Sequence, residues 1–170
     1  MNLAKFFHRP PGDDDRELLL IFDSGCNDGH TPRIGRGNRS VPDDDQTGGV
    51  LLIDAANVVG SRPTGWWRDR AGAARSLVDR VRAAVDSGRI ARPVTIVLEG
   101  KAREGAEMGV ADGLTVLHAT GGGDDTLIDV ATKASDQVTL VTADRELRRR
   151  AEAVGARVVG PGWLLELVEP

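Results

Sequence analysis

The chain has 170 residues with 22 Lys or Arg and 26 Asp or Glu, so its formal charge of -4 cannot hold a polyanion by bulk attraction. Its 40% hydrophobic and 28% charged residues are typical of a globular domain, and its apolar runs are far shorter than the roughly 20 residues of a membrane span. The one cysteine excludes an intrachain disulfide framework, which favours a reducing compartment and a cytoplasmic location.

Residues 1–46 differ in composition from the rest of the chain. They contain two Asp triplets, at 13–15 and 43–45, with scattered glycines and prolines and no sustained periodicity. We expect a flexible N-terminal extension, within which residues 18–22 could form one short strand. The remaining residues, 47–170, are expected to form one folded domain.

Strand and helix patterns alternate from Val50 onward. The stretch at 71–85 repeats apolar side chains at i, i+3 and i+4, as in a helix that buries one face. The strand-like runs lack polar alternation, which is typical of parallel strands covered on both faces. The pattern predicts an α/β fold, Rossmann-like, with a three-layer, doubly wound and mainly parallel sheet. Strands are expected at 50–53, 94–98, 114–117, 138–141 and 157–159, and helices at 71–85, 124–134, 144–153 and 162–168.

Acidic residues stand where the predicted strands end. Asp54 ends the first strand, Glu99 follows the second, and Asp144 follows the fourth. Asp124 and Asp125 lie where the chain begins the helix after the third strand. Ligands of open parallel sheets bind beyond the carboxyl ends of the strands, so we expect these carboxylates to converge. A hard divalent cation such as Mg²⁺ or Mn²⁺ would relieve their repulsion and bridge them to a phosphodiester.

Each of these polar residues also has a structural interpretation. Asp144 and one member of the acidic pair could cap the helices that follow them. Asp129, one turn beyond the pair and opposite the predicted core face, could simply be solvated. Asp54 has no capping role visible in the sequence, so a functional interpretation is favoured there. Asn57 could stabilise the turn that leaves the first strand or orient a water or phosphate.

Aromatic and basic residues follow the first strand-end acid. Trp66 and Trp67 are candidate stacking platforms for bases, and Arg62 and Arg68 flank them. The alternative is that both tryptophans cover the edge of the sheet. Arg145, at the start of a predicted helix, could bind a phosphate or belong to a solvated face.

Several common sites are excluded by missing motifs. The three histidines are isolated, with no His or Cys at zinc-ligand spacing. The sequence contains no GxGxxG, no GxxxxGK[ST] and no GxSxG. Dinucleotide-binding, Walker-type and α/β-hydrolase sites are therefore not expected.

Three motifs in order resemble a known family. IDAAN at the end of the first strand, GDDTLID at a helix start and TAD after a later strand resemble the NYN domain of the PIN-like nuclease superfamily, especially its YacP-like subgroup. The resemblance covers roughly residues 50–170. It implies a three-layer, PIN-like α/β fold, a metal-dependent site of three or four acids, and hydrolysis of RNA phosphodiesters. Residues 57–74 also resemble a subgroup signature whose members are sometimes labelled nucleotide pyrophosphohydrolases.

The resemblance assigns roles to individual residues. Asp54 and Asn57 match the first-strand motif, Asp125 the acid at the helix start, Asp129 the accessory acid and Asp144 the acid after the fourth strand. It implies that Asp54, Asp125 and Asp144 bind Mg²⁺ or Mn²⁺, while Asn57 and Asp129 assist. The sequence departs from the family in having Ala55 where many relatives have glycine. It also has Asp124 beside Asp125, which leaves open which of the two binds the metal.

We therefore expect a hydrolase, a metal-dependent ribonuclease with RNA as its substrate. Two alternatives remain open. A nucleoside-triphosphate pyrophosphohydrolase could use the same acids, and a non-catalytic RNA-binding module could use the tryptophans and arginines. The sequence leaves open the RNA target, the role of residues 1–46 and the oligomeric state, a homodimer included.

Overall fold

The computed structural model describes residues 49–169, so the predicted N-terminal extension of residues 1–46, with its strand at 18–22, lies outside the described residues. In chain order the elements are β1 (Val50–Asp54), α2 (Ala55–Gly60), α3 (Arg70–Asp86), β2 (Val94–Leu98), the 3-10 helix η1 (Gly100–Gly105), β3 (Gly109–Ala111), β4 (Leu114–His118), α4 (Gly123–Lys133), β5 (Val138–Val141), α5 (Arg145–Ala153), β6 (Arg157–Val159) and α6 (Pro161–Val168). No helix in this part of the chain combines the length and the apolar character that crossing a bilayer requires.

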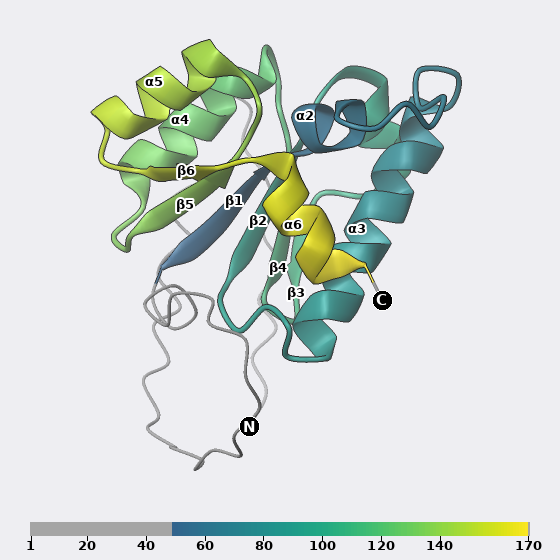
Figure 1. Cartoon of the computed structure of the whole chain (residues 1–170), viewed down its shortest axis with the longest axis horizontal. Coiled ribbons are helices and arrows are strands. Elements are labelled where there is room, and N and C mark those ends of the chain that lie inside the picture. The colour runs from purple at the N-terminus through teal and green to yellow at the C-terminus, as the bar shows by residue number, and fades with distance from the viewer. Residues whose placement is uncertain (1–48, 170) are drawn as a thin grey trace, which may run out of the picture. The chain divides into compact units, whose positions relative to one another are not determined.

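The strands form one sheet in the order β3-β4-β2-β1-β5-β6 (Figure 1). All neighbouring strands pair in parallel except β3, which is antiparallel to β4. The predicted mainly parallel α/β sheet is therefore confirmed, with element bounds within a residue or two of those expected. The elements that the sequence did not predict are α2, η1 and β3, which have six, six and three residues and are too short to show a hydrophobic period.

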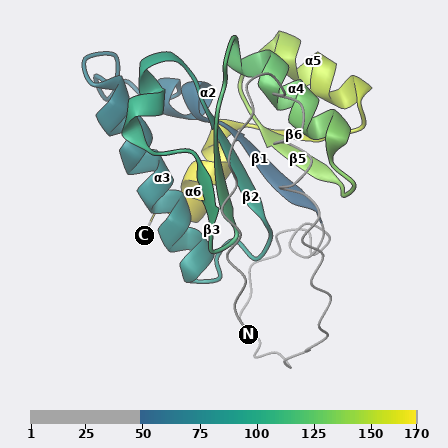
Figure 2. The same ribbon diagram turned by 180° about the vertical axis from the view of Figure 1, so that it is seen from behind.

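Helices cover both faces of the sheet. Helices α2, α3 and α6 pack on one face, and α4 and α5 lie on the other, as the two opposite views show (Figures 1 and 2). Strands β1, β2 and β5 are buried along their whole length, which explains why their sequences carry no polar alternation. The buried stripe of α3 ends one residue earlier than predicted, with Ala84 buried and Val85 only half-buried. The stripe consists of Ala74, Leu77, Val78, Val81 and Ala84.

The order of the strands in the sheet switches sides between the parallel strands β1 and β5. The chain moves from β1 outward to β2 and β4, and then α4 carries it back to β5 on the other side of β1. At such a switch point the two crossovers leave toward opposite faces of the sheet and open a crevice at the carboxyl ends of the strands. The residues that end β1 and follow β5 therefore lie where a ligand is expected.

A close contact between η1 and α3 holds the segment that follows β2. A Cβ added at Gly105 would lie 2.3 Å from the backbone oxygen of Ala71 and 3.0 Å from the Cβ of Ala74. Only glycine allows this approach, because the nearest atom belongs to the backbone of a helix that is itself packed against the sheet.

We expect Gly105→Ala to lower the free energy of unfolding by about 1–3 kcal/mol, the usual effect of forcing a methyl group into a packed contact. Urea titration followed by circular dichroism measures this difference. Gly109→Ala is the matched control, because a Cβ added at Gly109 meets no atom within 4 Å. Equal stability of the Gly105 variant and the wild type would contradict the close packing of η1 on α3.

Candidate active site

Asp54 is a buried carboxylate at the carboxyl end of β1. Asp54 is only 5% exposed, and both of its carboxylate oxygens accept hydrogen bonds from the protein. Oδ1 accepts from the backbone N–H of Asn57 at 3.0 Å, while Oδ2 accepts from the Asn57 side-chain amide at 2.7 Å and from the Thr142 hydroxyl at 2.9 Å. Asp54 therefore caps the short helix α2, a role that the sequence did not reveal because α2 itself was not predicted.

Thr142 connects Asp54 to Asp144 across the switch point. It follows β5, it is fully buried, and its hydroxyl donates to Asp54 while accepting from the backbone N–H of Asp144 at 3.1 Å. Asp144 is half-buried and caps α5, since its Oδ1 accepts from the backbone N–H of Leu147 at 2.8 Å. Two of the predicted site residues thus belong to one chain of hydrogen bonds. The sequence contained Thr142 within the TAD motif, but nothing there showed that its hydroxyl would reach β1.

Glu99 holds the start of α4 against the end of β2. Its Oε2 accepts from the backbone N–H of Gly123 at 2.8 Å. The N-cap residue of α4 is Gly122, which has no side chain to fill this role. A Cβ added at Gly123 would lie 2.8 Å from the same oxygen, so the glycine lets the glutamate approach the helix. Sequence reasoning noticed Glu99 as a strand-end acid but left it out of the expected metal ligands.

Asp124 and Asp125 face different neighbours. The Asp125 side chain is 81% exposed, and its Oδ1 accepts from Nη2 of Arg150 on α5 at 2.7 Å. The Asp124 side chain makes no hydrogen bond within residues 49–169, and its charge is repelled by Asp54 and Asp144 and attracted by Arg150. Arg150 therefore bonds to Asp125 and also attracts the charge of Asp124, while Asp124 in addition lies in the field of the other strand-end acids. We call Asp54, Glu99, Asp124 and Asp144 the strand-end acid cluster.

The cluster disfavours ionisation of two of its members. Burial raises the pKa of Asp54, and repulsion from Glu99 adds to the rise, although the hydrogen bonds from Asn57 and Thr142 act in the opposite direction. Loss of solvation raises the pKa of Asp124, followed by repulsion from Asp54 and Asp144. These carboxylates are therefore less stable in their ionised form than in an unfolded chain.

The donor set of the cluster suits a hard divalent cation. All of its ligand atoms are carboxylate oxygens, which Mg²⁺ and Mn²⁺ prefer, and a bound cation would offset the repulsion that raises the pKa of Asp124. Within residues 49–169, however, no three His, Cys, Asp or Glu side chains lie close enough together to hold a metal ion among them. Mg²⁺ commonly binds through one or two carboxylates and retains several waters, so this spacing is compatible with it.

The other predicted site residues lie apart from the cluster or play a supporting part. Asn57 contacts Asp54 directly through its backbone and its side chain. Asp129 is exposed on α4, and Arg145 is exposed as the first residue of α5. Arg62 is paired with Glu169, while Arg68 is exposed on the loop between α2 and α3.

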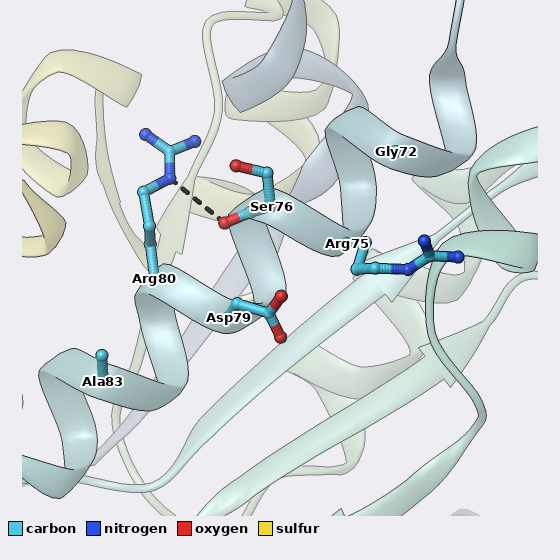
Figure 3. A pocket seen from close by; sticks show the side chains of 6 residues that line it. All are labelled: Gly72, Arg75, Ser76, Asp79, Arg80 and Ala83. Atoms are coloured by element: carbon cyan, nitrogen blue, oxygen red, sulfur yellow. Dashed lines mark hydrogen bonds between the residues drawn. The ribbon is translucent and has the colours of Figure 1, made fainter.

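A separate hollow lies along α3 and contains none of the strand-end acids (Figure 3). Its volume is about 410 Å³, and all of its lining residues come from that one helix. The Arg80 guanidinium, which donates to the backbone oxygen of Ser76 at 3.2 Å, lies along its wall. Since no acidic, basic and polar groups from separate elements converge there, the hollow is a groove on a helix surface rather than a second candidate active site.

Comparisons with known proteins support the fold. No family model matches the chain, and no curated protein matches it in sequence. The crystal structure of Rae1 (YacP) from Bacillus subtilis matches with a TM-score of 0.57 and 18% identity, over 71% of this chain and 73% of that chain. A single-residue mutant of the same protein matches with a TM-score of 0.56 and 17% identity, over 70% of this chain and 74% of that one. The resemblance to YacP-like proteins is therefore confirmed for the fold.

We expect Asp124→Asn to stabilise the metal-free protein at neutral pH. A carboxylate whose pKa is raised in the folded state contributes most to stability below its ordinary pKa, and this contribution is lost as the pH rises through the raised value. After allowance for solvent screening, removing the charge should add about 0.5 kcal/mol at pH 7, or about 2 °C in Tm.

Thermal unfolding in EDTA at pH 7 and at about pH 3 measures this difference, which should vanish at the lower pH because Asp124 is then protonated. Asp125→Asn is the matched control, since it removes a neighbouring charge that is paired with Arg150, and it should not raise Tm. An Asp124 variant with unchanged or lower Tm at pH 7 would contradict the proximity of Asp124 to the other acids.

Proposed function

We propose that this protein is a metal-dependent ribonuclease that hydrolyses RNA phosphodiester bonds at the strand-end acid cluster. The observation that supports this most strongly is the hydrogen-bonded link from Asp54 through Thr142 to Asp144 at the switch point between β1 and β5, with Glu99 and Asp124 near enough to act on Asp54 or be acted on by it electrostatically. The fold shared with Rae1 (YacP) agrees with the family resemblance of the three sequence motifs, and that resemblance implies RNA hydrolysis.

The cluster has features of a functional site rather than of a stabilising one. Its acids repel one another, and burial of Asp54 further disfavours the charge. Hydrogen bonds nevertheless hold three of the four carboxylates in fixed directions. Groups that are held in an unfavourable electrostatic environment gather at active sites, because the same environment favours a cationic ligand or a charged transition state.

One or two carboxylates of the cluster, drawn from Asp54, Asp124 and Asp144, would hold the divalent cation, and waters would complete its ligands. When bound, such a cation would polarise the phosphodiester and neutralise the charge that develops during hydrolysis. Asp124 takes the place that the sequence resemblance gave to Asp125, because the Asp125 side chain is hydrogen-bonded to Arg150, whereas that of Asp124 makes no hydrogen bond in the described part of the chain and lies in the field of Asp54 and Asp144.

The other residues of the site orient the acids and the substrate. Asn57 and Thr142 fix both oxygens of Asp54, so the carboxylate is already oriented before a ligand arrives. Arg145, one residue after Asp144, is exposed at the start of α5 and would contact a phosphate. Local arginines of this kind allow a chain of formal charge -4 to approach RNA.

We expect Asp144→Asn and Asp124→Asn to lose at least about 100-fold in the rate of cleavage of single-stranded RNA in Mg²⁺ or Mn²⁺. Asparagine caps helices as well as aspartate does, so Asp144→Asn should leave α5 intact while removing the charge. Asp125→Asn is the control and should keep its rate within about threefold of the wild type. Tm and circular dichroism confirm that each variant is folded.

Folded Asp144 and Asp124 variants that cleave RNA at the wild-type rate would overturn the assignment. Release of phosphate or pyrophosphate from nucleoside triphosphates, without RNA cleavage, would instead select the pyrophosphohydrolase alternative. RNA binding that survives both substitutions and EDTA, with no cleavage by the wild type, would select a non-catalytic module.

A further inference from the structure

Trp66 and Trp67 are neighbours with different surroundings. Trp66 is half-buried, with the Arg70 guanidinium carbon 5.6 Å from its ring centroid and Gly60 of α2 so close that an added Cβ would lie 3.7 Å from the ring. Trp67 is 54% exposed and lies edge to face with Trp66, the ring planes 82° apart and the centroids separated by 6.2 Å. Trp66 thus anchors the loop, while Trp67 presents a large apolar ring to solvent.

The loop that carries the exposed ring begins close to the acid cluster. Asp54 caps α2, and this helix has six residues, so residue 61 begins about 9 Å along the helix axis from the cap. Figure 1 shows the loop between α2 and α3 at the same edge of the molecule as the carboxyl ends of the strands. A nucleic-acid strand that has one phosphate at the acids and follows this edge would run toward the loop that carries Trp67.

The charges around Trp67 favour a polyanion as its partner. Arg68 is exposed next to it, and the Arg68 side chain makes no hydrogen bond or ion pair within residues 49–169. Arg62 and Arg70 are engaged elsewhere in the fold, by Glu169 and by Trp66. Arg68 is therefore the cation of this loop that remains available to a phosphate.

We propose that Trp67 is the stacking platform for one unpaired base, and that it makes the enzyme selective for single-stranded RNA. The proposal rests on the proposed function and names the substrate class of that same site. A base within a duplex is already stacked on both faces, so only an unpaired base can lie on the exposed ring. Trp66 supports the platform and does not itself contact the base.

The test measures binding rather than cleavage, so that its failure is distinct from failure of the proposed function. The full chain is titrated in EDTA with a short unstructured RNA of A and C, and with a blunt duplex that contains the same strand. Trp67→Ala should weaken binding of the single strand by about 5- to 100-fold and leave binding of the duplex unchanged, since stacking of one base is lost. Trp67→Phe, which retains an aromatic face, should restore most of the affinity.

Two further variants, Trp163→Phe and Arg68→Ala, separate base stacking on Trp67 from fluorescence changes at another tryptophan and from the charge of Arg68. The single strand should quench tryptophan fluorescence in the wild type and in Trp163→Phe, and the quenching should be lost in Trp67→Phe. Arg68→Ala should lower the salt dependence of binding by about one counterion and keep the preference for single strands.

Several results would overturn the proposal. Trp67→Ala with wild-type affinity for the single strand would show that no base stacks there. Equal loss of single-strand and duplex affinity in that variant, or unchanged quenching in Trp67→Phe, would also contradict a stacking role. RNA cleavage by the wild type would still establish the proposed function in each case.

Discussion

The hydrogen bond from the Thr142 hydroxyl to Asp54 joins the ends of β1 and β5, the two parallel strands at which the order of strands in the sheet switches sides. It is 2.9 Å long and buried, and the same hydroxyl accepts from the backbone of Asp144. Through it, the carboxylate at the end of β1 and the acid that follows β5 are held in one arrangement. The catalytic geometry proposed for this protein depends on that link. The two acids, residues 54 and 144, are 90 residues apart in the chain, and no other hydrogen-bonded side chain connects them in the described residues.

Like-charge repulsion explains why these acids are held so firmly. Separate segments deliver Asp54, Glu99, Asp124 and Asp144, and Asp54 and Asp124 would be more easily ionised farther from the other acids. Hydrogen bonds from Asn57, from Gly123 and from the start of α5 prevent three of them from turning away. The fold thus keeps a group of carboxylates that a divalent cation would stabilise, while exposed arginines lie outside it.

The sequence predicted the sheet and the strand-end acids, because buried parallel strands are continuous apolar runs in the sequence, and here these runs end at polar residues. It could not predict α2, which is only six residues long, and so it missed the capping role of Asp54. The choice between Asp124 and Asp125 depends on how the first turn of α4 is oriented. Glu99 and Arg150 both form hydrogen bonds to that turn. Such contacts join distant segments, and neither helical period nor motif spacing encodes them.

Calorimetric titration of Mn²⁺ into the metal-free protein tests the central claim most directly, since it detects the cation without requiring turnover. The wild type and Asp125→Asn should bind Mn²⁺ with similar affinity, whereas Asp124→Asn should bind it at least about tenfold more weakly. Absence of Mn²⁺ binding by the wild type, or loss of binding in Asp125→Asn with retention in Asp124→Asn, would contradict a cation site at the strand-end acid cluster.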